Sequence, residues 1–549
     1  MIAPSNAVAG STDLRAAVCI AGAGAAGITL ACELETLGVD VLLLDAGGPG
    51  WRGGVSQDPY RGSSAGAHPP PGHFRRRAFG GSTTLWGGRC VPYDPIDFEA
   101  RSYVPGSGWP IAYDEVARHY PAALAYCDAG VAEFDPVAAL PGSAPLLRGP
   151  APPGGEALLC ERIERYSLPT DFGRRYGRRL ARSSRVRVVS HAQVVRVLRA
   201  EDGGSIAALE FVARDGRRQC VRAQRYVLAL GGIETVRLLW ASDPSGTGYG
   251  NHADCLGRYY TCHLENVIGT VRPGGATAPT LDFERTRDGV YARRKLQLGA
   301  AVQRRERLLN IAFRLHYPNV ADAAHGSSVL SAVYLAKRAL VPEYRRILVH
   351  GADHGDWPAH LRNVVAGAPS LARFGLRWMT RRVLARRKLP YVLVGNADGS
   401  VPIEFNAEQT PLPDSRITLG TERDAYGMPR VHVHWRCCEH DIDSICRAYR
   451  VLRDGLAAQA GVALALDFDA LAERVRHSVP VGGHHLGGAR MADAPARGVV
   501  DTDGAVFGLP NLYVAGAAVF PTSGHANPTL TITAMAIRLA HHLKVSLDE

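Results

Sequence analysis

Residues 17–45, AVCIAGAGAAGITLACELETLGVDVLLLD, decide the fold. The apolar run at 17–21 suits a buried parallel strand, and apolar residues then recur with helical spacing until a stop at Gly38. A second apolar run ends at Asp45. Strand, helix and strand in this order predict a βαβ unit of an α/β fold with a parallel sheet.

Three glycines and one acid of this unit have the spacing of a dinucleotide site. Gly22 permits the tight turn after the strand, Gly24 lets a pyrophosphate approach the backbone, and Gly27 allows the helix to press on the strand. The helix N-terminus offers free N–H groups to the phosphates. Asp45 stands where an acid accepts ribose hydroxyls, which favours NAD or FAD over NADP.

The composition sets the broad class. The chain has 549 residues, of which 46% are hydrophobic and 21% charged, so disordered, collagen-like and coiled-coil proteins are excluded and two domains are expected. No run of about 18 apolar residues predicts a membrane span, and the N-terminus does not resemble a secretory signal. Eleven scattered cysteines without CxxC pairs favour a reduced, cytoplasmic protein.

A second glycine-rich stretch follows at residues 79–99, FGGSTTLWGGRCVPYDPIDFE. It contains Gly80, Gly81 and Gly87, together with the hydroxyls of Thr83 and Thr84. Small residues and exposed N–H groups suit a second approach of the backbone to a large polar ligand. The stretch therefore predicts a loop that meets the same ligand as the dinucleotide turn.

With these segments the sequence resembles the GMC (glucose-methanol-choline) family of FAD-dependent oxidoreductases, in its bacterial, pyranose-oxidase-like and sugar-oxidising branch. The similarity continues over residues 225–242, 408–435, 482–491 and 511–543. It implies that the GG-S/T segment covers the flavin and the pyrophosphate. Covalently flavinylated relatives have His before the Trp of this segment, whereas Leu85 precedes Trp86 here, so noncovalent FAD is expected.

The resemblance also implies the residues that bind the cofactor. Val194 matches the strand position whose backbone contacts adenine, and Pro528 and Thr529 match the segment whose backbone N–H groups lie at the pyrimidine end of the flavin. The full set of expected cofactor-binding residues is Gly22, Gly24, Gly27, Asp45, Gly80, Gly81, Thr83, Thr84, Trp86, Gly87, Val194, Gly231, Gly516, Asn527, Pro528 and Thr529.

The catalytic residues come from the C-terminal motifs. Oxidation of an alcohol requires a group that takes the hydroxyl proton and a second polar group that holds the developing alkoxide. His484 begins the family's H-x-x-G motif and is the expected base, while Asn527 is the expected orienting partner. Two alternatives stay open, His485 as the base and His525 as the second catalytic group.

The family's domain organisation is discontinuous. The resemblance implies a Rossmann-type FAD-binding domain at residues 14–110, 185–265 and 480–549, and an α+β substrate-binding domain at residues 111–184 and 266–479. Alternation at 431–435 after a turn at 427–429 supports strands in the second domain, which is expected to contain an antiparallel sheet. The active site is expected between the two domains, over the flavin.

Two other segments have the residue types of known functional motifs but not the structural context that those motifs require. GSSAG at residues 62–66 has the pattern of a hydrolase nucleophile elbow, but it lies in a Gly/Pro/Ser-rich stretch that predicts a loop. Residues 432–440 contain His and Cys, but the alternation there predicts an ordinary strand and the spacing is not that of a zinc site. Neither a hydrolase nor a metal site is predicted.

The sequence thus predicts an FAD-dependent alcohol oxidoreductase that acts on a CH–OH group of a sugar, glycoside, cyclitol or similar polyol. The alternatives are a sterol, terpene or aliphatic alcohol oxidase, and a non-redox flavin lyase or isomerase of the same family. The expected partners are a small-molecule alcohol and oxygen or another electron acceptor. The sequence leaves open which hydroxyl is oxidised, whether the enzyme is an oxidase or a dehydrogenase, and its oligomeric state.

The net charge of +11 is concentrated in one stretch. Residues 271–390 contain 22 Lys or Arg and 8 Asp or Glu, and the densest part is 371–390. Arg373, Arg377 and Arg381 are expected on one helical face. A solvated face is the plain interpretation; an acidic partner, an anionic substrate or a peripheral membrane contact are the functional ones, and no specific nucleic acid is expected.

Overall fold

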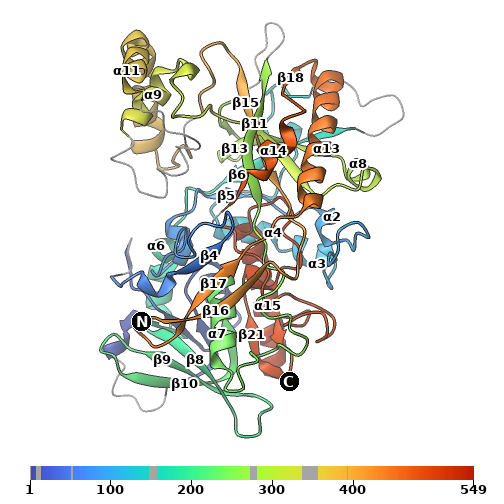
Figure 1. The fold of residues 1–549 in the computed structure, drawn as a ribbon. Coiled ribbons are helices and arrows are strands. Elements are labelled where there is room, and N and C mark those ends of the chain that lie inside the picture. Colours follow the sequence, from blue (N-terminus) through green and yellow to red (C-terminus); the bar gives the residue numbers. More distant parts are fainter. Residues whose placement is uncertain are drawn as a thin grey trace.

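The computed structural model describes residues 2–7, 14–50, 54–147, 157–272, 281–336, 356–391, 393–481 and 483–549. Figure 1 shows two large sheets at opposite ends of an elongated molecule, with the C-terminal helix beside the lower one. Parts of the predicted basic stretch, residues 273–280 and 337–355, and Gly482 of the histidine motif lie outside the described residues.

The first sheet is mostly parallel and has β2 near its centre. The strands in order are β1 (Ile2–Pro4), β7 (Val186–Ser190), β3 (Val41–Asp45), β2 (Leu14–Ala21), β10 (Arg218–Leu228), β21 (Leu509–Val514) and β20 (Ala505–Val506), and β8 (Gln193–Arg199) and β9 (Ile206–Val212) extend it beyond β10. All neighbours from β1 to β21 pair in parallel. The predicted βαβ unit is confirmed as β2, α1 (Ala25–Thr36) and β3, and the chain leaves α1 through Gly38 at φ 78°.

Helices cover the parallel sheet because its strands are apolar on both faces. Every residue of β3 is buried. α1 packs against the C-terminal helix α15 (Thr529–Asp548) and against α6 (Phe172–Arg182), while α15 also contacts α3 (Tyr113–Ala117) and α4 (Tyr120–Tyr126). α7 (Gly232–Ser242) follows β10 directly.

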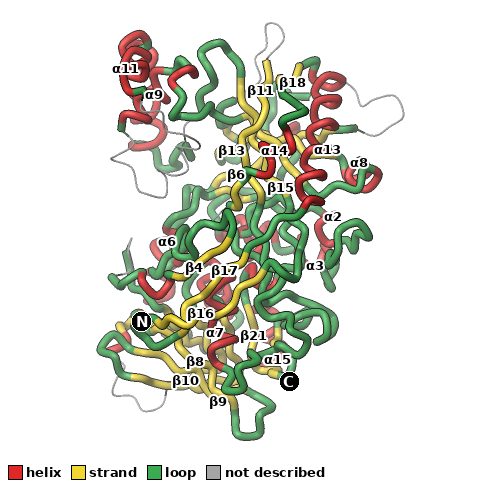
Figure 2. Tube along the Cα trace, viewed as in Figure 1, coloured by secondary structure: helices red, strands yellow, loops and turns green. Residues whose placement is uncertain are grey.

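The second sheet is antiparallel throughout. The strands in order are β18 (Ala463–Ala465), β11 (Leu264–Arg272), β15 (Val401–Ala407), β14 (Ile311–Leu315), β13 (Tyr291–Leu298), β6 (Leu159–Tyr166) and β5 (Arg89–Cys90), with β12 (Glu284–Arg285) beside β13 and β19 (Val479–Pro480) beside β11. The helices α13 (Glu439–Gly455) and α14 (Leu471–Arg476) contact each other beside this sheet, as Figure 2 shows in red and yellow. The expected antiparallel sheet is therefore present.

A third, three-stranded sheet corrects one expectation. β16 (Arg416–Arg423) pairs with β17 (Pro429–His434), as the alternation predicted, and β17 pairs in parallel with β4 (Gly62–Ala65). The loop predicted at 62–66 is therefore wrong, because residues 62–65 form a strand. A Cβ at Gly62 would lie 2.4 Å from Val431 O, so the glycine allows this close pairing.

The remaining helices are short, apart from those of one projecting group. α2 (Pro95–Phe98), α5 (Pro136–Ala139) and α8 (Ala300–Arg305) lie in connections. α9 (Ser328–Leu335), α11 (Trp357–Ala366), α12 (Ala368–Trp378) and the π-helical turn Met379–Val383 lie beside the second sheet, with α9 and α11 at the upper left of Figure 1. Among the described residues, no helix combines the length and the apolar character needed to cross a membrane.

The domain boundaries expected from the sequence stay a prediction. Most strands of the first sheet come from residues 14–110, 185–265 and 480–549, and most strands of the second come from the other segments. β5 belongs to the second sheet although it precedes residue 110, and β11 begins at Leu264.

A buried ion pair links the loop after α2 to the end of β15. Arg101 donates from both terminal nitrogens to the Glu408 carboxylate, at 2.8 and 2.5 Å, and both side chains are at most 2% exposed. Glu408 also accepts from the Asn310 backbone N–H, and the next residue, Gln409, donates its N–H to Ser523 Oγ. The pair therefore ties the loop after α2 to the second sheet, and the adjacent Gln409 ties the same sheet to a C-terminal segment.

Replacing Arg101 with Met should leave the Glu408 carboxylate buried without its partner. We expect the free energy of unfolding to fall by about 3–5 kcal/mol, because an uncompensated buried charge remains. Urea denaturation of the wild type and R101M measures the difference. The control is Arg304→Met, whose partner is Glu99 and whose side chain is 50% exposed, so its loss should be about 1 kcal/mol or less. Equal losses in the two variants would contradict the role given to the buried pair.

Candidate active site

The parallel sheet brings distant sequence motifs to one edge. β2, β3, β10 and β21 end at the same level, because Ala21 pairs with both Leu44 and Leu228, and Leu228 pairs with Val514. Asp45 is the last residue of β3, and the turns after the other three strands contain Gly22, Gly231 and Gly516. Ligands of such sheets bind at the carboxyl ends of the strands, so four of the expected cofactor residues share one side of the fold.

The dinucleotide turn requires glycine at two positions. Gly22 has φ 103°, and a Cβ there would lie 2.4 Å from Ala229 O. A Cβ at Gly27 would lie 1.8 Å from Gly22 O, since α1 starts directly against the turn. Both glycines are therefore needed for the fold of the turn itself.

Gly24 differs, because no atom lies within 4 Å of a Cβ built there. Its backbone lies against the second glycine-rich loop. The Gly80 N–H donates to Ala23 O at 2.8 Å, and a Cβ at Gly81 would lie 3.0 Å from Gly24 Cα. The two glycine segments, about 60 residues apart, therefore form one backbone cradle.

Asp45 is held beside this cradle. Its carboxylate accepts from the Ala23 N–H and the Gly47 N–H, both at 2.8 Å, and the residue is 7% exposed. Burial raises the pKa of the Asp45 carboxyl to about 7, while these N–H groups and the charge of Arg77 lower it. Each carboxylate oxygen can accept a further hydrogen bond, so hydroxyl donors of a ligand can still bind.

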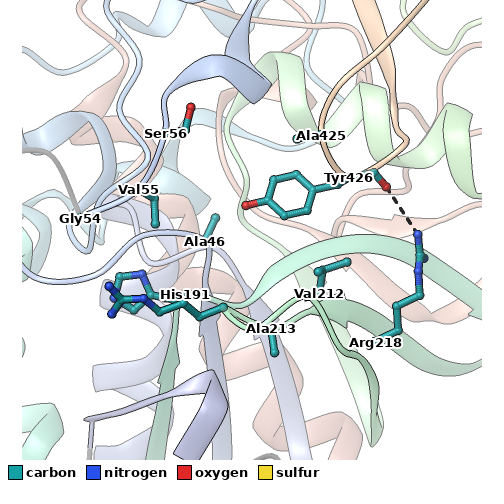
Figure 3. Close-up of a pocket in the computed structure, with 12 residues that line it drawn as sticks. Ala46, Gly54, Val55, Ser56, His191, Val212, Ala213, Arg218, Ala425 and Tyr426 are labelled. Carbon is teal, nitrogen blue, oxygen red and sulfur yellow. Dashed lines mark hydrogen bonds between the residues drawn. The ribbon is translucent and has the colours of Figure 1, made fainter.

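A cavity of about 350 Å³ opens next to Asp45. It is lined by Ala46, by His191 from the turn between β7 and β8, and by Tyr426, whose carbonyl accepts from Arg218 at 3.5 Å (Figure 3). The expected adenine-contacting residue Val194 lies on β8, a few residues after His191, and is buried.

The other expected cofactor residues divide into two groups. Thr83, Thr84 and Trp86 bond to the protein: Thr83 to Gly80 O, Thr84 to Gly81 O, and the Trp86 indole to Thr170 O at 2.9 Å. Gly87, Gly231 and Gly516 have no atom within 4 Å of a built Cβ, so they border open space. The threonines and the tryptophan therefore shape the loop, while these glycines leave room for a ligand.

The start of α15 provides the third part of the site. Asn527 and Pro528 directly precede the helix, which begins at Thr529 and runs for 20 residues. The first N–H groups of a helix are free, and its dipole is positive at this end. Pro528 itself has no N–H, so the expectation of a donor at this residue is wrong, and the donors are those of Thr529 and the next residues of the first turn.

His484 and Asn527 are brought together. The Asn527 Nδ2 amide donates to His484 Nε2 at 2.9 Å, and Asn527 Oδ1 is buried without a hydrogen-bond partner. Backbone pairing holds the histidine: Thr261 and Leu486 exchange both hydrogen bonds, and Val481 N–H donates to His263 O. The two residues expected as the catalytic pair therefore lie in contact, with one polar atom free for a ligand.

A hydrogen-bond chain sets the tautomer of His484. His263 Nε2 lies 3.0 Å from the Ser523 carbonyl oxygen, which can only accept, so this nitrogen is the donor. His263 Nδ1, 2.7 Å from His484 Nδ1, is then the acceptor in the neutral ring. His484 therefore carries its proton on Nδ1, and Nε2 presents a lone pair.

The surroundings keep this pair of rings neutral. Burial lowers the pKa of His484 well below its ordinary value, and the nearby His263, Arg89, His485 and Arg314 lower it further. Burial also lowers the pKa of His263 to about 3. A neutral imidazole is the form that can accept a proton, and the Nε2 lone pair accepts from the Asn527 amide until a ligand donor takes that place.

His485 turns to different partners. Its Nδ1 lies 2.6 Å from the Tyr260 hydroxyl, which also lies 2.8 Å from His68 Nε2 and 3.4 Å from Cys262 Sγ. The ligand atoms of His68, Cys262 and His485 are within 4.8 Å of one another, but the Tyr260 hydroxyl already bonds all three. Burial raises the pKa of the Cys262 thiol to about 12, which keeps it protonated. The cluster is thus a hydrogen-bonded support behind His484.

His525 is enclosed by the protein. It is 1% exposed, and its Nε2 is contacted by Gln297 Nε2 at 2.7 Å, Lys295 Nζ at 3.2 Å and Asp94 Oδ2 at 3.2 Å. Burial lowers the pKa of Lys295 to about 8. His525 therefore has less access to a ligand than His484, which is only partly buried.

Charged side chains from the second sheet lie near enough to His484 to affect its pKa. Arg314 bonds Glu164 at 2.7 Å and Glu404 at 3.0 Å, and Arg89 lies 3.5 Å from Glu164. The neighbouring arginines lower the pKa of Glu164 to about 2, against the effect of its burial. The two cations that lower the pKa of His484, Arg89 and Arg314, are thus themselves held in place by carboxylates.

The residues present fit a bound flavin dinucleotide. The open face of Gly24 and the other glycines bordering open space leave room for it, while the free N–H groups of α15 and the unpartnered Asn527 Oδ1 offer polar partners. Sequence reasoning missed His263, which lies just before β11 in TCHLEN and belongs to no motif. Its only signal is the contact with His484, 221 residues away.

Comparison with known proteins identifies the class. Residues 411–536 match the family described as GMC oxidoreductase. Paromamine 6'-oxidase of Streptomyces fradiae is 25% identical over 95% of this chain and 90% of that protein, and the fructose dehydrogenase large subunit of Gluconobacter japonicus is 24% identical over 96% and 97%. A solved structure of formate oxidase from Aspergillus oryzae superposes with a TM-score of 0.54 at 15% identity, covering 98% of this chain and 99% of that chain, which shows the shared fold.

Replacing Gly24 with Val tests the cradle. The added side chain meets open space in the protein, so we expect the variant to fold, but it should fill the room left for the pyrophosphate and reduce bound FAD at least about tenfold. Flavin absorbance per protein after purification in excess FAD is the measurement. The control is Gly375→Val, which also has no atom within 4 Å of its Cβ and lies on α12. Full FAD occupancy in G24V would contradict the cradle.

Proposed function

Since this chain belongs to the GMC oxidoreductases and is an FAD enzyme acting on CH–OH groups, we propose that it oxidises a hydroxyl of a sugar, glycoside, cyclitol or similar polyol, with His484 as the base. One observation carries the proposal: His484 Nε2 presents a lone pair 2.9 Å from Asn527 Nδ2, in a tautomer set by His263 and Ser523.

The chain's own residues handle the proton. His484 Nε2 accepts the proton of the substrate hydroxyl, and Asn527 orients that hydroxyl through its amide. The alkoxide that develops is stabilised by the same amide and by the nearby charges of Arg89 and Arg314. Bound FAD would supply the hydride acceptor, so the substrate would lose one proton and one hydride and become a carbonyl compound.

The proposed cofactor contacts follow the fold. Gly22, Gly24 and Gly27, with Gly80 and Gly81 across from them, would hold the pyrophosphate against the start of α1. Asp45 would accept the ribose hydroxyls, and the cavity lined by Ala46 and His191 would receive the adenine. Leu85 has no nucleophilic atom, which supports noncovalent binding. The parallel sheet and this set of contacts support a Rossmann-type FAD domain.

The substrate class rests on the relatives. Their names give paromamine and fructose as substrates, and one is called an oxidase and the other a dehydrogenase. We therefore propose that the first substrate is a carbohydrate-like alcohol and that the second substrate is oxygen or another electron acceptor. All eleven cysteines are free thiols, which supports our proposal of a reducing, cytoplasmic location.

Anaerobic flavin reduction with a panel of sugars, glycosides, aminocyclitols and sterols tests the function. At least one carbohydrate-like alcohol should bleach the flavin, and His484→Ala should slow the reduction about 10²–10⁴-fold, because the proton acceptor is gone. His485→Ala is the matched comparison and should lose less than about tenfold, since His485 bonds Tyr260 instead. If no alcohol reduces the flavin, or if H484A reacts as fast as the wild type, the proposal fails.

The pH dependence tests the histidine pair. Because the pKa of His484 is lowered, the base stays neutral as the pH falls, and the rate of flavin reduction should not yet decline at pH 6.5, near the ordinary pKa of histidine. His263→Ala removes one cause of the low pKa and the acceptor for His484 Nδ1, so the rate should fall at least about tenfold and the acid limb should move to higher pH. His263→Asn, which keeps an acceptor oxygen, should recover part of the rate. An unchanged pH profile in H263A would contradict the positioning role.

A further inference from the structure

The helices beside the second sheet form an unusual surface, which we call the basic lobe and define as residues 356–388. No acidic residue occurs between Asp356 and Asp398. Eight cations occur in the same interval, namely Arg362, Arg373, Arg377, Arg381, Arg382, Arg386, Arg387 and Lys388. The lobe is therefore strongly positive.

Large apolar side chains are exposed on the same lobe. Among the described residues, twelve large apolar side chains are exposed. Seven of them lie in the basic lobe, which is 33 residues long, namely Trp357, Leu361, Val365, Leu376, Met379, Val383 and Leu384. Leu384 is 74% exposed and Val365 and Leu376 are 69% exposed. Exposed apolar side chains that gather in one region of a surface mark an interaction site.

The exposed apolar residues form stripes. Trp357, Leu361 and Val365 follow one another at four-residue intervals along α11. Leu376, Met379 and Val383 have spacings of three and four through α12 and the π-helical turn. Residues at these spacings lie on one side of a helix, so each stripe is continuous.

The inner side of α12 is anchored to the rest of the protein. Phe374 stacks on Trp378 at 5.9 Å between ring centroids, and Trp378 packs against a buried cluster that contains Phe283, Tyr291 and Leu389. Because α12 already packs on the protein through Trp378, its exposed apolar stripe is a second face of the helix and not the face that packs on the core.

The cations flank the outward stripe. Arg373, Arg377 and Arg381 follow at four-residue intervals, as the sequence predicted, and all three are exposed. Arg377 forms an ion pair with Asp282 of a neighbouring segment, while Lys388 donates to a backbone carbonyl, which leaves its charge in place. The outer side of α12 thus combines an apolar stripe with a basic one.

We propose that the basic lobe binds the surface of an anionic lipid membrane, with Trp357, Leu376, Met379 and Val383 among the side chains that enter the headgroup region. An interfacial helix has this composition, an apolar face beside Arg and Lys that reach the lipid headgroups. The charge excludes a second copy of the same lobe as the partner, because two such positive surfaces repel. The helix α11, which contains the first stripe, projects at the upper left of the molecule in Figure 1, where it is accessible to an extended surface. The cytoplasmic leaflet carries the matching negative charge.

Vesicle sedimentation with the full-length, FAD-loaded protein tests the proposal. The vesicles are phosphatidylcholine alone or phosphatidylcholine with phosphatidylserine. We expect binding to the anionic vesicles, little binding to the neutral ones, and a strong decrease at high salt. Arg373→Gln with Arg381→Gln should weaken binding about 30-fold, at roughly 1 kcal/mol for each cation. Leu376→Ser with Leu384→Ser should weaken it at least about tenfold.

The control variant is Val137→Ser with Val545→Ser, which removes two exposed apolar side chains elsewhere and should bind as the wild type does. Polyglutamate serves as a soluble acidic competitor in parallel. Binding to polyglutamate without binding to anionic vesicles would overturn the membrane proposal in favour of an acidic macromolecule. Vesicle binding that L376S/L384S retains in full would overturn it as well.

Discussion

The register of four parallel strands is the constraint on which the candidate site depends. β2 and β3 come from the start of the chain, β10 from its middle and β21 from its end, and the four strands end level with one another. Their ends therefore lie side by side, which brings together Asp45 at the end of β3 and the turn residues Gly22, Gly231 and Gly516. A shift of one strand by a residue would move its turn away from the others, so the cofactor cradle exists only in this register.

A second dependence runs from a carbonyl oxygen to the base. Ser523 O decides which nitrogen of His263 is protonated, and His263 decides the same for His484. This hydrogen-bond chain requires both histidines to be neutral. Burial and nearby cations lower the pKa of His484 and His263 and so keep the two rings neutral. Asn527 completes it from the start of α15, a helix that packs on the first helix of the dinucleotide unit. The same packing that stabilises the fold therefore orients the proposed catalytic pair.

Local patterns were predictable where a segment's neighbours are close in sequence. The βαβ unit at 17–45 and the strand at 431–434 appear as expected, because hydrophobic periodicity and turn residues report on local structure. The strand at Gly62–Ala65 was missed, since its partner β17 lies more than 360 residues away and supplies the pairing. His263 was missed for the same reason. Pro528 was expected among backbone donors, but proline has no N–H to give.

The amino-acid sequence alone determined the dinucleotide turn, the second glycine loop, His484 and Asn527 as candidates, and the stretch that concentrates positive charge. These depend on residue type and short spacing. Only the tertiary structure decided that the two glycine loops touch, that His484 rather than His485 meets Asn527, and that the exposed apolar stripes lie beside the cations. Such facts depend on contacts between distant segments, and burial and register, rather than local propensity, determine which contacts form.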